Sequence, residues 1–153
     1  MKILKILTEK RKIGDFGEKA AAKYLRKNRY RILEKNYVSG NAEIDIIACT
    51  KEVTAFVEVK TRNIKSLGTK QDRPASAVTP EKQRKIINAA SHYINRHKPN
   101  TRLSLDIIEV YIEDDSKRGV KVSEIKHIKS AFNLNTAFDS KYAYKRSKEG
   151  SNL

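Results

Sequence analysis

The feature that most constrains the fold is a pair of β-forming segments, residues 42–50 and 53–61, that only Lys51 and Glu52 separate. Two such runs joined by two residues predict a β-hairpin. Because side chains alternate between the faces of a strand, one face is expected to be wholly apolar and buried. It consists of Ile44, Ile46, Ala48, Ala55, Val57 and Val59.

The opposite face carries charges at one end. In a turn symmetric about Lys51 and Glu52, Asp45 lies opposite Glu58, and Glu43 lies opposite Lys60. Facing carboxylates destabilise a sheet, whereas a divalent cation bridging them removes the penalty. Ligation by oxygen alone suits Mg²⁺ or Mn²⁺. This register is assumed, because a slip of one residue moves Asp45 to the apolar face.

These residue types also suggest a reaction. A bound divalent ion can supply a nucleophilic water and offset charge on a phosphoryl oxygen. Lys60, two residues after Glu58, can orient or deprotonate that water or stabilise the charged transition state. We therefore predict Asp45, Glu58 and Lys60 as catalytic residues. The ordinary alternative is a charged strand face on which Lys60 pairs with Glu43 or Glu58.

The charge balance points to a polyanionic partner. The chain has 33 Lys and Arg against 18 Asp and Glu, a formal net charge of +15. Nucleic acid is the commonest partner of such a protein, because phosphate neutralisation releases condensed counterions. A basic protein with no such partner is the alternative on composition alone.

Several other classes of protein are disfavoured. Cys49 is the only cysteine, so neither an intramolecular disulfide nor a cysteine-based zinc cluster can form. The three histidines have no zinc-binding spacing. The first residues resemble a signal peptide poorly, and no apolar run approaches the length of a membrane span. A cytoplasmic protein without a membrane partner is expected.

The remaining elements complete a single domain of the α/β class. Asp15 and Glu18 have the spacing of a capping box for a first helix over residues 15–28. Thr79, followed by Pro80, predicts the start of a second helix. Further strands are expected over residues 29–37, 103–112 and 120–128. We expect a mixed central sheet flanked by helices over residues 13–132, a basic N-terminal extension (1–12) and a basic flexible tail (133–153).

Several motifs in order carry a resemblance to a known family. They are Gly14-Asp15-Phe16-Gly17-Glu18, Glu43-Ile44-Asp45-Ile46-Ile47-Ala48, Phe56-Val57-Glu58-Val59-Lys60-Thr61-Arg62, Lys82-Gln83, Arg102 with Asp106, and His127-Ile128 with Ala131-Phe132. Over residues 13–132 the chain resembles the YraN-like family of bacterial proteins. That family is placed in the PD-(D/E)XK, restriction-endonuclease-like nuclease superfamily.

The resemblance implies a metal-dependent phosphodiesterase fold. Asp45, Glu58 and Lys60 match the motif's two acids and its lysine, and Glu18 matches a first-helix acid that can join the metal shell. By the same resemblance, Arg62, Lys82 and Gln83 are expected to contact nucleic acid. Two residues depart from the pattern: Ile44 stands where the superfamily's name has proline, and Ala42 where the family usually has glycine.

Three functions remain open at this point. The first is a Mg²⁺- or Mn²⁺-dependent nuclease acting on DNA, with branched or single-stranded DNA as its expected form. The second is a nucleic-acid-binding module that keeps the nuclease fold without turnover. The third is a protein-interaction factor with acidic partners. A homodimer is expected only by analogy with junction-cutting enzymes.

Overall fold

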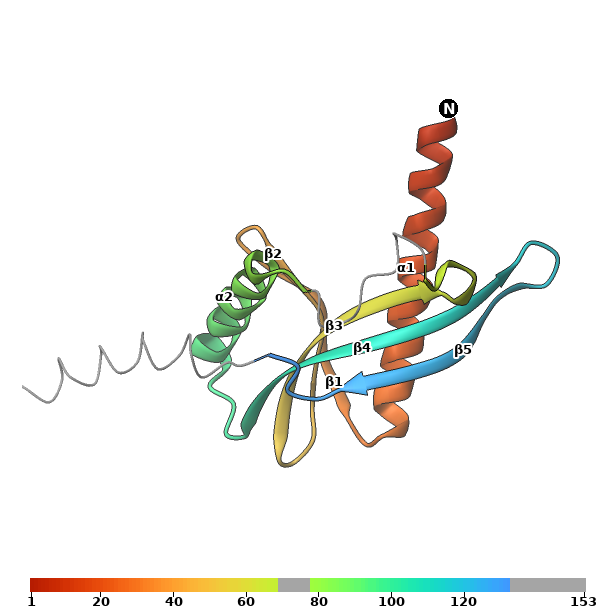
Figure 1. The fold of residues 1–153 in the computed structure, drawn as a ribbon. Helices are drawn as coiled ribbons and strands as arrows, with labels where there is room; N and C mark the ends of the chain where they lie inside the picture. The colour runs from red at the N-terminus through yellow and green to blue at the C-terminus, as the bar shows by residue number, and fades with distance from the viewer. Residues whose placement is uncertain (69–77, 133–153) are drawn as a thin grey trace, which may run out of the picture.

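The computed structural model describes residues 1–68 and 78–132, in which a five-stranded sheet lies between two helices (Figure 1). The strand order is β1-β2-β3-β4-β5. The elements are α1 (Lys2–Lys27), β1 (Arg31–Ser39), β2 (Ala42–Cys49), β3 (Val53–Asn63), the short 3-10 helix η1 (Ile64–Ser66), α2 (Pro80–His97), β4 (Arg102–Asp115) and β5 (Gly119–Ile128). The predicted tail (133–153) and residues 69–77 lie outside the described residues.

The sheet is mixed because one pair of neighbouring strands is parallel. β3 and β4 run parallel, and the chain between them includes α2, as a parallel connection requires. The other three pairs are antiparallel. This arrangement confirms the predicted α/β class, a restriction-endonuclease-like mixed sheet flanked by helices.

Each helix covers its own face of the sheet. α2 packs through Ile86, Ala90 and Tyr93 onto a cluster that includes Ile47 and Phe56. α1 packs onto the other face through a second buried cluster: Ala21, Ala22, Leu25, Ile46, Ala48, Ala55, Val57, Ile108, Val110 and Ile112. The sheet is therefore buried on both sides.

The first helix is longer than predicted. α1 begins at Lys2, with Met1 as its N-cap residue, so Asp15 lies within the helix and the predicted capping box with Glu18 is wrong. Residues 2–13 are mostly Lys, Leu, Ile, Glu and Arg, with no glycine or proline to end a helix. Glu18 therefore has no capping role. The predicted start of the second helix is confirmed, since the Thr79 side chain accepts a hydrogen bond from the Lys82 backbone N–H at 3.2 Å.

The hairpin has the predicted register only near its turn. Four pairs, from Ile46–Val57 to Cys49–Thr54, follow it. Among the described residues the ladder between β2 and β3 ends at Ile46–Val57, so the predicted pairing of Glu43 with Lys60 does not form.

The alternation of side chains along β2 also breaks at Asp45. Ile44 packs with Ile47 in the cluster under α2, whereas Ile46 packs under α1. The predicted position of Ile44 on the same face as Ile46 is therefore wrong. On β1, the pairs Lys35–Ile46 and Tyr37–Ile44 flank the break. Between them Asn36 has a φ of 50°, in the left-handed region, which interrupts a regular strand.

No helix within residues 1–68 and 78–132 is long and apolar enough to cross a membrane.

Candidate metal centre

Asp45 and Glu58 lie where β2 and β3 separate. Instead of a backbone pair, the Asp45 Oδ2 atom accepts a hydrogen bond from the Val59 backbone N–H at 2.7 Å. This bond spans the gap that opens after the Ile46–Val57 pair. Asp45 and Glu58 are therefore not the ladder pair that was predicted. Their carboxylates still interact, because the charge of Glu58 raises the pKa of Asp45.

Glu58 is buried, yet its charge is only partly compensated. The residue is 6% exposed, and its Oε1 atom lies 3.2 Å from Lys60 Nζ and 3.6 Å from Lys82 Nζ. Its Oε2 atom is buried without a hydrogen-bond partner among the described residues. A buried carboxylate oxygen without a partner is costly, so this atom is available to a ligand.

The pKa of Asp45 is strongly raised. Burial, followed by repulsion from Glu58, raises the pKa of Asp45 to about 7, although the bond from Val59 opposes the shift. Glu18 adds a smaller repulsion and Lys82 a small attraction. At neutral pH, this carboxyl is therefore poised between its protonated and charged forms.

Two further acids border the pair. Burial and then repulsion from Asp15, Glu43 and Glu58 raise the pKa of Glu18. With its side-chain amide turned so that the nitrogen faces them, Asn36 donates to Glu43 Oε1 at 3.0 Å and to Glu18 Oε2 at 3.2 Å. Glu43, which the sequence left without a role, is thus linked to Glu18 through Asn36.

The donor set fits a hard divalent cation. Mg²⁺ is usually bound by one or two carboxylates, with water and substrate phosphate filling its other positions. Asp45 and Glu58 supply two carboxylates, one of them with an unsatisfied buried oxygen. Within the described part of the chain, no three His, Cys, Asp or Glu side chains are close enough together to hold an ion. Glu18 as a third ligand therefore stays a prediction.

The other predicted site residues fall into two groups. Lys60 and Lys82 reach the site, where both lie beside Glu58. Gln83 and Arg62 are engaged elsewhere: Gln83 Nε2 donates to the Val78 carbonyl at 2.8 Å, and Arg62 Nε lies 3.1 Å from Glu109 Oε1. The contacts of Arg62 and Gln83 with nucleic acid stay predictions.

Sequence reasoning missed the residue that seats α1 on the sheet. A Cβ atom at Gly17 would lie 1.8 Å from Thr61 Oγ1, so only glycine permits this approach of α1 to β3. The contact brings Glu18, the next residue, towards the strand that carries Glu58 and Lys60. A glycine inside a helical pattern often has such a packing reason, which is the indication that could have revealed it.

Asn36 was also missed, because nothing in the sequence marks an asparagine within a strand as a residue with a left-handed backbone. Its left-handed φ is one that asparagine adopts more readily than most residues. The side chain then lies between two carboxylates, where an amide can donate without adding charge.

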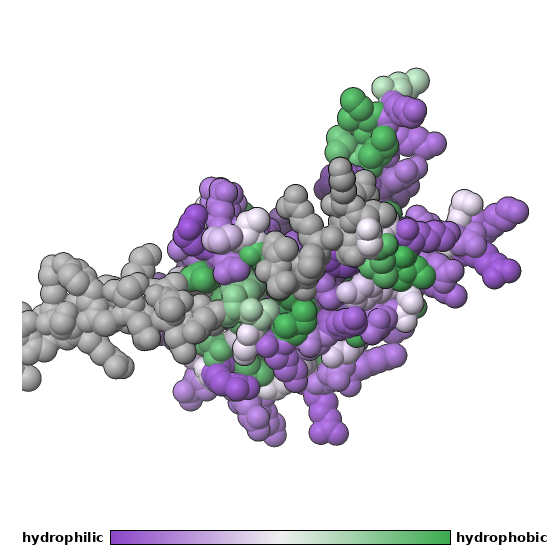
Figure 2. Space-filling model, in the orientation of Figure 1, coloured by the Kyte–Doolittle hydropathy of each residue, from purple (hydrophilic) through white to green (hydrophobic). Residues whose placement is uncertain are grey.

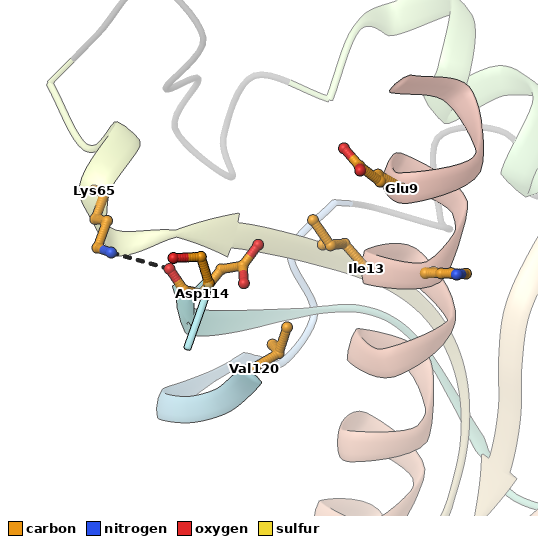
Figure 3. Close-up of a pocket in the computed structure, with 7 residues that line it drawn as sticks. Glu9, Ile13, Lys65, Asp114 and Val120 are labelled. Atoms are coloured by element: carbon orange, nitrogen blue, oxygen red, sulfur yellow. Dashed lines mark hydrogen bonds between the residues drawn. The ribbon is translucent and has the colours of Figure 1, made fainter. Parts of the chain in front are cut away.

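The hollow shown in Figure 3 is a different part of the molecule. This cavity of about 510 Å³ lies between α1, η1 and the turn that joins β4 to β5, and residues such as Glu9, Ile13 and Val120 line it. On the side away from α1, Lys65 Nζ donates to the Asp114 carbonyl at 3.0 Å (Figure 3). Because neither Asp45 nor Glu58 lines it, it does not belong to the candidate metal centre.

Comparison with known proteins gives a consistent family match. The model of the uncharacterised protein family UPF0102 matches residues 17–110. A UPF0102 protein of Clostridium perfringens is 42% identical over 123 residues, which is 80% of this chain and 94% of the relative. One from Chlorobaculum parvum is 43% identical over 121 residues, covering 78% of this chain and 91% of the relative.

Proposed function

We propose that this chain, which belongs to the uncharacterised protein family UPF0102, is a Mg²⁺- or Mn²⁺-dependent nuclease that hydrolyses phosphodiester bonds in DNA. The observation that carries the proposal is the buried Glu58 carboxylate, with one oxygen lacking a partner, beside Asp45, whose pKa is raised to about 7. Two acids so placed repel each other, and a divalent cation removes that repulsion.

In the proposed mechanism, Asp45 and Glu58 hold the ion. The bond from the Val59 N–H fixes one oxygen of Asp45, so the carboxylate keeps its orientation. When bound, the ion supplies Lewis-acid stabilisation of the phosphoryl oxygens and lowers the pKa of a water. Protonated Asp45 must lose its proton before it can serve as a ligand, so binding is favoured above about pH 7.

The two lysines supply positive charge at the same point. Lys60 Nζ and Lys82 Nζ lie on the same oxygen of Glu58 and come from different elements, β3 and α2. With side-chain exposures of 38% and 42%, both can reach a substrate phosphate from that position. In this proposal, Lys60 orients or deprotonates the attacking water or stabilises the charge that develops in the transition state. Lys82 binds a phosphate that does not react.

The proposal is tested by incubating the full chain with linear, single-stranded and branched DNA, with Mn²⁺, Mg²⁺ or a chelator. Cleavage is expected only with metal, and it should be lost in Asp45→Ala and Glu58→Ala. Glu52→Gln is the matched control, because this exposed acid of the same hairpin lies at its turn. Cleavage that survives both alanine substitutions would refute the site.

A second function rests on the net charge of +15, which favours DNA binding whether or not the site turns over. A binding module predicts salt-dependent binding that a chelator leaves unchanged, with no products in any metal. A protein-interaction factor predicts no DNA affinity at moderate salt. A cytoplasmic location stays an expectation from the sequence, and a homodimer stays an expectation by analogy with junction-cutting enzymes.

A further inference from the structure

The N-terminal half of α1 presents apolar side chains to solvent. Every residue from 1 to 12 is exposed, although the stretch forms a regular helix. Ile3 is 76% exposed, Leu4 71%, Leu7 58% and Ile6 46%. This half of α1 extends beyond the sheet (Figure 1), and Figure 2 shows apolar side chains gathered at its projecting end. Such a patch on a monomer marks an interaction surface.

This helical segment is amphipathic and strongly basic. Ile3, Leu4 and Leu7 lie on one side of the helix, whereas Lys5, Glu9 and Lys12 lie on the opposite side. Lys10 and Arg11 follow Leu7 at spacings of three and four, so the apolar side ends in two basic residues. The basic residues of the segment are Lys2, Lys5, Lys10, Arg11 and Lys12, and its only acid is Glu9. The partner must therefore take aliphatic side chains and negative charge together.

This requirement argues against a second copy of the chain. Two such helices side by side would bring basic residues together, in molecules that each carry a net charge of +15. Four aliphatic side chains also fall well short of the roughly 800 Å² that each partner of a stable dimer buries. Nucleic acid supplies the negative charge, but its phosphate backbone offers no apolar surface for the leucines.

We propose that residues 1–12 form an interfacial helix that docks on an anionic lipid bilayer, with Ile3, Leu4, Ile6 and Leu7 in the acyl-headgroup boundary. A basic helix with a narrow aliphatic face has the chemistry that such a surface recognises. The segment lies on the bilayer surface and does not span it. The proposal therefore departs from the expectation of no membrane partner, which rested on the absence of an apolar run long enough to span a membrane. Because the family match begins at residue 17, this docking is a property of the chain outside the matched region.

Docking leaves the candidate metal centre accessible. Leu7 and Glu18 are separated by roughly 16 Å along the helix axis, at about 1.5 Å per residue. The helix turns its C-terminal half towards the sheet, where Gly17 contacts Thr61, so only the projecting half is available to the bilayer. The inference does not depend on the proposed nuclease activity.

The test is flotation of the full chain with phosphatidylcholine vesicles, with and without phosphatidylglycerol. The wild type is expected to float only with the anionic vesicles at low salt. The triple variant Ile3→Ser/Leu4→Ser/Leu7→Ser should lose about 30-fold or more in partitioning. Lys2→Gln/Lys5→Gln should lose about 5-fold for each charge removed.

Two matched control variants test whether vesicle binding depends on residues 1–12 rather than on any exposed apolar side chain or any exposed charge. Val38→Ser/Leu67→Ser/Val122→Ser removes three exposed apolar side chains elsewhere, and Lys51→Gln/Lys117→Gln removes two exposed charges elsewhere. Both are expected to float like the wild type. Circular dichroism and thermal unfolding of each variant confirm that it is folded.

Three results would overturn the proposal. One is wild-type protein that stays unbound with anionic vesicles at low salt, the result expected if the stripe fits an acidic protein groove. Another is equal flotation of the Ile3, Leu4 and Leu7 variant. The third is a dimeric wild type alongside a monomeric Ile3→Ser/Leu4→Ser/Leu7→Ser variant, measured by molecular mass in solution. That result would make this apolar face an interface between two copies of the chain.

Discussion

At the residue scale, the fold holds the carboxylates of Asp45 and Glu58 where they repel each other. Burial and the Glu58 charge raise the pKa of Asp45 to about 7. In the unfolded chain the same group titrates near 4. Between these two values the folded state binds a proton that the unfolded state has released, so the contribution of Asp45 to stability falls as pH rises through this window.

The metal-free protein should therefore become less stable between about pH 4 and about pH 7, in part because of Asp45. Asp45→Asn keeps an acceptor for the Val59 N–H and removes the charge. It is expected to raise the free energy of unfolding at about pH 8 by about 1–3 kcal/mol, with little effect at about pH 4. Urea unfolding at both values, in chelator, measures the difference. An equal effect at both would contradict the assigned cause.

The two lysines beside Glu58 should differ in their effect on catalysis. Lys60→Met is expected to lower metal-dependent cleavage by about 100-fold, because it removes a group assigned to the reacting atoms. Lys82→Met should cost less than about 10-fold, mainly by weakening substrate binding. Single-turnover rates at saturating DNA measure both. A larger loss of rate in Lys82→Met would reverse the two assignments.

At the scale of elements, the register of the hairpin could be predicted from the sequence only near its turn. Its turn and the register from Ile46–Val57 to Cys49–Thr54 follow from alternating apolar residues around a two-residue connection. The separation of β2 from β3 at Asp45 could not be predicted. It accompanies the left-handed φ of Asn36 on β1 and a side-chain bond to Val59, neither of which alters the hydrophobic pattern.

The start of α2 could also be predicted from the sequence, whereas the start of α1 could not. Thr79 and Pro80 fixed the start of α2, since a cap and an N1 proline act locally. α1 was predicted to begin at Asp15 because Asp15 and Glu18 have the spacing of a capping box. Its residues 2–12 are all exposed, so packing periodicity gave no indication of where it begins. The seating of Glu18 beside Glu58 depends on a tertiary contact of Gly17 with Thr61.

Gly17 provides a direct test of that contact. Gly17→Ala would bring a methyl group to within 1.8 Å of Thr61 Oγ1, so it is expected to cost about 2–4 kcal/mol of unfolding free energy. Gly14→Ala is the matched control: nothing lies within 4 Å of its Cβ position, and it should stabilise the helix by up to about 1 kcal/mol. Thermal or urea unfolding distinguishes them. A neutral Gly17→Ala would show that α1 is not held against β3 in this way.

A second buried network holds the end of β5 to β4. His127 Nε2 lies 2.7 Å from Asp106 Oδ2, and the Ser104 hydroxyl and the Ser130 N–H donate to Asp106 Oδ1. Burial alone would raise the pKa of Asp106, but these bonds outweigh it and hold that pKa below its usual value. The bonds therefore stabilise the fold above about pH 4, and that stabilisation is lost as pH falls through the lowered pKa.

Asp106→Asn is accordingly expected to destabilise the protein by about 2–4 kcal/mol at neutral pH, because it weakens several bonds to a buried charge. The loss should shrink as the solution is made more acidic. Glu124→Gln, an exposed acid on β5, is the matched control and should change stability little. Urea unfolding across the acidic range measures both. A loss that grows towards low pH would contradict this assignment.

At the scale of the whole molecule, the net charge sets the salt dependence expected of the proposed DNA binding. A net charge of +15 should make binding strongly salt-dependent, with affinity falling by about 10³-fold or more between about 50 and about 200 mM salt. Fluorescence anisotropy with labelled DNA in chelator measures this. Binding that is insensitive to salt would contradict phosphate neutralisation as its source.

The central claim is that Asp45 and Glu58 together form a divalent-cation site, and Mn²⁺ titration followed by electron paramagnetic resonance tests it most directly. At about pH 8, above the raised pKa of Asp45, the wild type and Glu52→Gln should bind Mn²⁺ equally. Asp45→Asn and Glu58→Gln, both folded, should each lose that binding. Unchanged Mn²⁺ affinity in Glu58→Gln would contradict the account.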